Sequence, residues 1–255
     1  MRRIMAIALM GFTEAVRDRI LYSLLAFALL MIGSSTILVT LSVGGEGKVV
    51  KDLGMAAISL VGLLIAVFIG VGLVSREIER RTIYPVMTRP VHRAEFVLGK
   101  FLGLGLTLLV NVAIMAAGLL SLTRLLEGRW SLELLPAILL AFVELLVLTA
   151  AAILFSTFST PTLSAIFTLS LFAIGRLSAD LRTFAQQFGG PGLRALATGL
   201  TAVLPNLASF NITEASIYGL PLGPAYVPLT LLYGGAYIVL ILAAAAAIFS
   251  GRDLK

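Results

Sequence analysis

The stretch SREIERRTIYPVMTRPVHRAEFVLGK (residues 75–100) is a dense polar segment that separates two long apolar runs. It holds six Lys/Arg and three Glu, whereas Leu53–Ser75 before it and Phe101–Thr123 after it carry no charge. A helix needs about 20 apolar residues to cross about 30 Å of hydrocarbon. The two runs are therefore predicted membrane spans, and the segment between them is predicted to lie in water.

The rest of the chain has the same apolar character. Its 255 residues are 59% hydrophobic and 13% charged, with a mean hydropathy of +1.05, which is typical of an integral membrane protein. Apolar runs predict six transmembrane helices, over residues 20–43, 53–75, 101–123, 134–156, 161–178 and 226–250. Pro161 separates the fourth span from the fifth, because proline does not continue a helix. The predicted fold class is thus an all-α integral membrane protein, with one transmembrane domain over residues 1–255.

The region between the fifth and sixth spans, residues 179–225, is mixed in character. Leu193–Pro205 is apolar, but it is too short to cross a bilayer as a helix. This length favours short re-entrant or interfacial helices on the outer side of the membrane. A seventh span is the alternative.

The distribution of Lys and Arg predicts the orientation. With the N-terminus in the cytoplasm, twelve Lys/Arg fall in cytoplasmic segments and seven fall outside. Cytoplasmic loops carry the excess of positive charge in membrane proteins. The polar segment at residues 76–100 and both termini are therefore predicted to be cytoplasmic.

Most catalytic chemistries lack the residues they need. His92 is the single histidine, so no multi-histidine metal site is available, and the absence of cysteine excludes disulfides and thiol chemistry. Neither Gly47-Lys48 nor Gly99-Lys100 fits the phosphate-binding pattern G-x-x-x-x-G-K-[ST]. Basic residues are spread over the loops, which does not favour nucleic-acid binding. The chain is predicted to be no enzyme and to bind no metal or cofactor itself.

The polar segment shows the local signals of two short helices joined by a break. Ser75 is a suitable helix cap, and Glu77 and Glu79 suit the positive end of a helix dipole. Pro85 is predicted to end this helix, and Pro90 to begin a second one that runs into the third span. Orientation requires only Lys and Arg, because acidic residues contribute little to it. The mixed charge therefore favours a docking surface for a partner protein over a loop that only sets topology.

Residues 1–19 are predicted to form an amphipathic helix along the inner membrane surface. Ile4, Ile7, Ala8 and Gly11 can share one apolar face. The charged residues that bracket this face are Arg2, Arg3, Glu14, Arg17 and Asp18. An early start of the first span is the alternative.

The segment REIERRTIYPVMTRPVHRAEFVLGKFLG (residues 76–103) resembles the cytoplasmic loop of permease subunits of ATP-binding-cassette (ABC) transporters, in the type-two exporter class. Weaker likenesses extend over the chain, in residues 6–25, 155–182, 204–212 and 249–255. Within the class, the chain resembles the permease of the nitrous-oxide reductase copper-maturation transporter and gliding-motility permeases.

The resemblance implies six transmembrane helices with an interface helix before them, a cytoplasmic coupling helix, and short re-entrant helices between spans five and six. It implies export by a permease homodimer in the bacterial inner membrane, driven by two copies of a cytoplasmic ABC ATPase that binds ATP and Mg, and leaves room for accessory periplasmic or membrane proteins. The predicted ATPase-coupling residues are Arg76, Glu77, Glu79, Arg80, Arg81, Thr82, Tyr84, Pro85, Arg89, Pro90, Arg93 and Glu95.

Glu144 lies in the middle of the fourth predicted span. A charge there costs about 2.5–3.5 kcal/mol on insertion scales, so this side chain should face protein or water. It is predicted either to line a transport path or to hold helices together through a hydrogen bond, with Asn111 of the third span as a candidate partner. Arg176, at the predicted outer end of the fifth span, is expected to reach the lipid head groups.

A stand-alone secondary transporter or channel is the alternative function. Such a protein needs polar groups along a route near the membrane midplane, usually beside broken helices. Only Glu144 and Asn111 are candidates for that route. A membrane-embedded enzyme lacks any nucleophile and base to support it.

Overall fold

The computed structural model describes residues 2–39, 46–79, 93–178 and 204–251, together with single positions between 183 and 199. Every regular element in these residues is a helix, which confirms the all-α prediction. The elements are α1 (Arg2–Val16), α2 (Arg19–Val39), α3 (Glu46–Glu79), α5 (Arg93–Glu127), the 3₁₀ helix η1 (Leu132–Leu134), α6 (Leu135–Phe158), α7 (Pro161–Arg176), the 3₁₀ helix η2 (Leu207–Phe210), α10 (Thr213–Tyr218) and α11 (Tyr226–Gly251).

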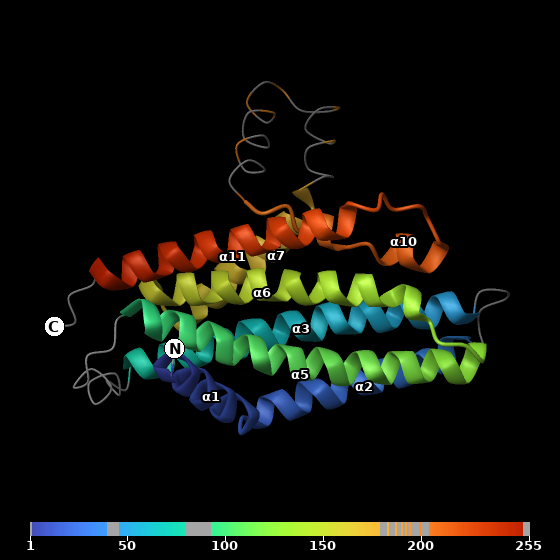
Figure 1. Cartoon of the computed structure of the whole chain (residues 1–255), viewed down its shortest axis with the longest axis horizontal. Helices are drawn as coiled ribbons and strands as arrows, with labels where there is room; N and C mark the ends of the chain where they lie inside the picture. The colour runs from blue at the N-terminus through green and yellow to red at the C-terminus, as the bar shows by residue number, and fades with distance from the viewer. Residues whose placement is uncertain are drawn as a thin grey trace.

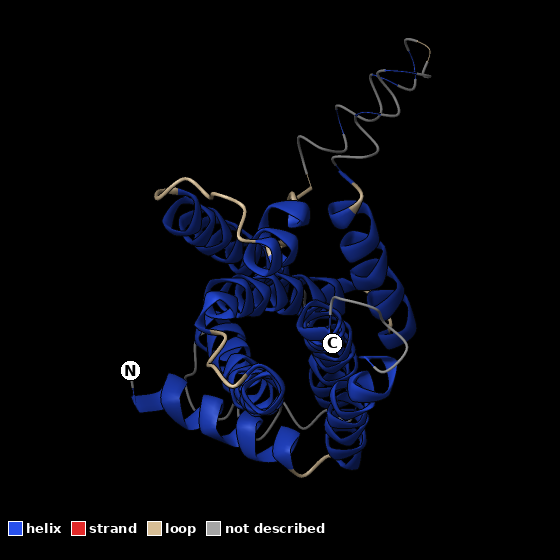
Figure 2. Cartoon of the chain, turned by 90° about the vertical axis from the view of Figure 1, so that its right-hand side faces the viewer, coloured by secondary structure: helices blue, strands red, loops and turns tan. Residues whose placement is uncertain are grey.

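The long helices form a bundle, and α3 lies between α2, α5 and α6 (Figure 1). The helix α1 crosses α5 obliquely at one end of this bundle (Figures 1 and 2). That end also contains the end of α3 at Glu79, the start of α5 at Arg93 and the last turn of α11. We call it the loop end. The opposite end, with η1 and α10, is the far end.

Among the described residues, five helices are long and apolar enough to cross a membrane, namely α2, α3, α5, α6 and α11. By the length and composition of these helices, the chain is a multi-pass membrane protein. The helix α7 has 16 residues, so it is about 24 Å long, which is shorter than the hydrocarbon core of about 30 Å. The fifth predicted span, residues 161–178, thus stays a prediction, and so does the total of six spans.

The helices α3 and α5 extend beyond the apolar runs that predicted them. A separate helix beginning at Ser75 was expected, but α3 continues through this residue to Glu79. Residues 76–79 contain good helix formers and no proline or glycine, so nothing ends the helix there. At its other end α3 begins at Glu46, and α5 runs without interruption from Arg93 to Glu127.

Within the described helices, proline occurs only in the first turn. Pro161 is the first residue of α7 and follows Thr160 in an extended conformation. The helix break that was predicted at Pro161 is therefore confirmed. Pro136 and Pro228 fall in the first turns of α6 and α11, where the missing N–H costs no intrahelical hydrogen bond.

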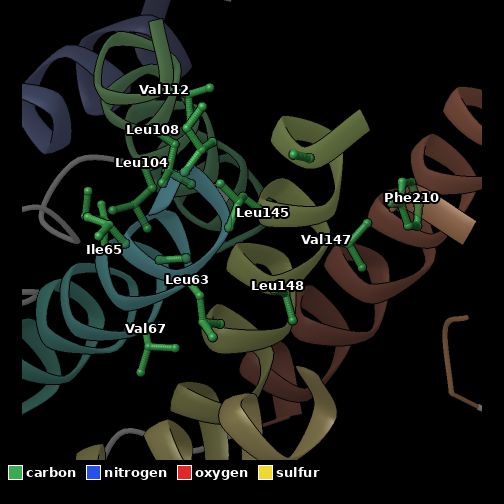
Figure 3. Packing of buried hydrophobic residues seen from close by; sticks show 14 of the residues in the cluster. Leu63, Ile65, Val67, Leu104, Leu108, Val112, Leu145, Val147, Leu148 and Phe210 are labelled. Carbon is green, nitrogen blue, oxygen red and sulfur yellow. The ribbon is translucent and has the colours of Figure 1, made fainter. Parts of the chain in front are cut away.

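The apolar core is centred on α6, which packs against α3 on one side and α11 on the other. Leu145 of α6 points toward α3 and α5 (Figure 3), where Leu104 is also buried. Val147 points in the other direction, toward α11 and Phe210. A side chain at Gly234 of α11 would meet Phe210, so this glycine lets η2 pack closely on α11.

Candidate functional site

The structure describes the two margins of the predicted coupling segment. Arg76, Glu77 and Glu79 belong to the last turn of α3, and Arg93 and Glu95 to the first turn of α5. The remaining predicted coupling residues, Arg80, Arg81, Thr82, Tyr84, Pro85, Arg89 and Pro90, lie outside the described residues. The segment therefore joins the ends of two long helices that pack along one another.

Charged side chains join α3 to α5 at the far end. The Lys51 ammonium is 2.8 Å from Glu127 Oε1 and 3.0 Å from Glu133 Oε1, and the Lys51 side chain is only 5% exposed. The Ser131 hydroxyl donates to Glu127 Oε2. The helix that was predicted to begin at residue 53 begins earlier in the structure, because α3 starts at Glu46 and includes Lys51. Its two carboxylate partners allow the ammonium to be buried inside the helical part of the chain.

At the loop end, α1 packs on α5 through two glycines. A Cβ at Gly103 would lie 2.6 Å from the carbonyl oxygen of Ala8, and one at Gly99 would lie 2.7 Å from the Ile7 Cβ. Small residues allow such close approach of two helix backbones. Ala8 and Gly11, two members of the apolar face predicted for α1, are buried against α5. The position of α1 along the membrane surface stays a prediction.

The charged residues predicted for the interface helix are found in and just after α1. Arg2 and Arg3 form its first turn, and Glu14 Oε2 lies 3.7 Å from the buried ammonium of Lys100 on α5. Arg17 and Asp18 form the turn that follows. The Asp18 carboxylate accepts the Ile20 N–H at 3.0 Å and thereby caps the start of α2.

Glu144 and Arg176 form a two-point ion pair between α6 and α7. Arg176 Nε donates to Glu144 Oε1 and Nη2 donates to Oε2, both at 2.8 Å. The Glu144 side chain is 2% exposed, and that of Arg176 is 23% exposed. The guanidinium also lies over the Phe172 ring, 5.4 Å from its centroid. Each charge thus neutralises the other inside an apolar bundle.

This pair corrects two expectations. Arg176 was expected to reach the head groups, but it turns to Glu144 because an acid in the bundle offers a closer and stronger partner. Asn111 was the candidate partner of Glu144, but its amide nitrogen donates to the Thr107 carbonyl of its own helix at 2.8 Å. Its side-chain oxygen is buried and has no hydrogen-bond partner among the described residues. Glu144 therefore holds helices together, and Asn111 does not contribute to that contact.

The position of the pair also fixes where α7 ends. Glu144 lies nine residues after the first residue of α6, which corresponds to about 14 Å along the helix. Arg176 is the last residue of α7. Since the two side chains meet, α7 ends well short of the level at which α6 begins. The chain at residues 204–218 then continues toward the far end as η2 and α10.

One signal for the ion pair was present in the sequence. Glu144 and Arg176 are opposite charges that bound a long uncharged run, and an isolated charge in hydrocarbon is costly. Pairing the two was therefore the least costly arrangement. The Lys51 cluster carried no comparable signal, because lysine and glutamate are ordinary residues at the ends of spans.

Five long apolar helices and charges neutralised within the bundle define a multi-pass helical membrane protein. The chain belongs to the family described as ABC-2 family transporter protein, whose family model matches residues 5–254. It is thus an ABC-2 type permease, a membrane transport component that is not itself catalytic, of a family that generally pairs with an ATPase subunit. A search of curated proteins gives no match.

Proposed function

We propose that this permease is moved by a separate cytoplasmic ABC ATPase that contacts residues 76–95. Two permease copies and two ATPase copies would form the transporter, with ATP and Mg bound by the ATPase. The direction of transport would be export across the bacterial inner membrane, with both termini of the permease in the cytoplasm. We further propose that, within its family, the chain is related to the permeases of nitrous-oxide reductase copper maturation and of gliding motility.

The continuity of α3 and α5 is the observation that carries the proposal. The two helices have 34 and 35 residues, so each is about 50 Å long and exceeds the hydrocarbon thickness. Both continue past their apolar runs toward the proposed ATPase contact. A push on the connecting segment therefore acts on two uninterrupted helices rather than on a loop that absorbs it.

Contacts at both ends of this helix pair would transmit such a push. Lys51 joins α3 to Glu127 of α5 at the far end, and α1 packs on Gly99 and Gly103 of α5 at the loop end. A nucleotide shifts the equilibrium between two permease conformations only through its differential affinity for them. These contacts would transmit the resulting movement of the connecting segment to the membrane-spanning part of α3 and α5.

The test compares Glu77→Lys with Glu214→Lys. Glu77 belongs to the proposed ATPase contact, whereas Glu214 lies on α10 at the far end, so the two variants make the same charge change at opposite ends. We expect Glu77→Lys to insert normally but to lose ATPase co-purification or permease-dependent ATP hydrolysis. Glu214→Lys should retain both. Wild-type coupling in Glu77→Lys would refute the proposed contact.

A stand-alone secondary transporter receives little support from the described residues. It needs a titratable group that is free to exchange ions during transport. Glu144, its main candidate, is held by two hydrogen bonds from Arg176. Transport by the purified chain without any ATPase would nevertheless favour it.

A further inference from the structure

An open hollow of about 330 Å³ lies between η2 and the first turns of α11. It is lined by Asn206, Ser209, Tyr226, Leu229, Thr230 and Tyr233. The four residues from α11 are spaced at i, i+3, i+4 and i+7, so they share one face of that helix. The volume is within the range of small-molecule sites, which starts at about 300 Å³.

Hydrogen bonds fix the aromatic walls of the hollow. The Tyr226 hydroxyl donates to the Ser209 carbonyl at 2.9 Å, and the Asn206 N–H donates to the Tyr233 hydroxyl at 2.8 Å. The Tyr233 ring also packs against Phe210, 6.0 Å between centroids. Two tyrosine rings are thus held in place on the side of α11.

Two polar groups in the wall remain available for a ligand. The Asn206 side-chain oxygen accepts a hydrogen bond from Ser178 at 3.0 Å, which orients the amide. Its amide nitrogen and the Ser209 hydroxyl have no hydrogen-bond partner among the described residues. An amide N–H and a hydroxyl are suitable partners for hydroxyl groups.

The charge of the lining restricts the ligand. None of the six described residues that line the hollow is charged. A phosphate or an ammonium placed there would find no counter-charge, and burying an unpaired charge is costly. A hydroxylated, uncharged group avoids this cost and can also pack on the tyrosine rings.

An exposed apolar stripe of α11 continues from the hollow. Leu229 is 62% exposed and Leu240 is 65% exposed. They lie on one helix stripe with Tyr233 and Ala236, because the spacing of four, three and four residues repeats the helical period. A molecule with its head in the hollow can therefore place an apolar tail along the span.

We propose that this hollow holds the head group of a membrane lipid, and that this head group is uncharged and hydroxylated, such as a sugar. The lipid tail lies along the Leu229–Leu240 stripe. Tyr226, Tyr233, Asn206 and Ser209 form the head-group site. The site belongs to this chain alone and does not depend on an ATPase partner.

The experiment measures lipid retention by the purified full-length chain, using native mass spectrometry from detergent. The probes are monoglucosyl diacylglycerol, phosphatidylglycerol with matched acyl chains, and methyl glucoside as the head group alone. We expect the chain to retain the glucosyl lipid in preference to phosphatidylglycerol. Methyl glucoside at the same concentration should displace little of it, since it lacks the tail.

Matched variants locate the site. Leu229→Trp places a large side chain in the hollow, whereas Leu232→Trp makes the same change at a residue that is 72% exposed and does not line it. We expect Leu229→Trp to reduce glucosyl-lipid retention to the phosphatidylglycerol level and Leu232→Trp to leave it unchanged. Ser209→Ala removes a hydroxyl that has no described partner, so the fold should persist while retention weakens about fivefold.

Three results would overturn the proposal. They are equal retention of the two lipids by the wild-type chain, equal retention of the glucosyl lipid by the two tryptophan variants, and displacement of the lipid by methyl glucoside at equal concentration. None of these results bears on ATPase coupling, which the Glu77→Lys comparison tests separately.

Discussion

The guanidinium of Arg176 meets the carboxylate of Glu144 side-on, with both nitrogen–oxygen distances at 2.8 Å. This contact ties the last residue of α7 to the interior of α6. Neither charge could remain in an apolar bundle alone without a large desolvation cost. The pair therefore explains how α7 can end between apolar helices.

Removing one partner of this pair should be more harmful than removing both. We expect Arg176→Met to lower the free energy of unfolding by about 3–5 kcal/mol, because Glu144 is left buried and unpaired. Adding Glu144→Leu should recover most of the loss. Denaturation in mixed micelles, followed by circular dichroism, measures both values. Arg129→Met is the control, since that side chain is 72% exposed, and its effect should stay below about 1 kcal/mol.

The Lys51 cluster should be a stability determinant of the far end. Lys51→Met leaves Glu127 and Glu133 without the ammonium that lies within 3.0 Å of each. We expect a loss of several kcal/mol, on the order of 3. Lys48→Met, three residues earlier at an exposed position where the ammonium lies 4.6 Å from the Tyr218 ring centroid, should lower stability by no more than about 1 kcal/mol. Equal effects of the two variants in the same denaturation assay would contradict the role assigned to Lys51.

The close packing of α1 on α5 should be sensitive to one methyl group. A Cβ at Gly103 would meet the Ala8 carbonyl oxygen at 2.6 Å, and this neighbour is backbone. We expect Gly103→Ala to push α1 away and to cost about 1–3 kcal/mol. Gly33→Ala is the control, because no atom lies within 4 Å of its added Cβ. There the change should be neutral or stabilising, by up to about 1 kcal/mol.

The link between η2 and α11 should depend on one phenol oxygen. Tyr233→Phe removes the acceptor of the Asn206 N–H and should cost about 1 kcal/mol. It should also speed hydrogen exchange of the Asn206 amide, which mass spectrometry can follow in a peptide covering residues 204–212. Tyr22→Phe on the exposed side of α2 should leave that exchange unchanged. If the Asn206 amide exchanges at the same rate in the two variants, its hydrogen bond to Tyr233 does not hold η2 in place.

The all-α class and the apolar middle parts of the long helices were predicted correctly from the sequence, because both follow from the length of the uncharged runs. The ends of these helices were misplaced wherever a charge is paired. Lys51 and Lys100 were taken as limits of spans, yet both are buried within helices, since their acidic partners come from segments distant in the sequence. Such tertiary pairs cannot be inferred from local composition.

The candidate site was recovered less completely. Gly99 and Gly103 contact α1 closely; small residues spaced four apart are typical of close helix contacts, but they do not identify the partner helix. Glu144 was correctly expected to face protein, while its pairing with Arg176 was missed. The hollow beside Tyr233 had no local signature, because its lining is built from η2 and α11 together. The proposed coupling residues stay predictions.

The restriction of proline to first turns has a mechanical consequence. Sharp kinks usually need proline or a disrupted hydrogen-bond ladder, and the described helices have no proline beyond their first turns. A change of shape in this protein should then proceed by tilting of whole helices. Tilting alters the cross-sectional area that the protein occupies in the bilayer, so lateral pressure and membrane tension would enter the energetics of its working cycle.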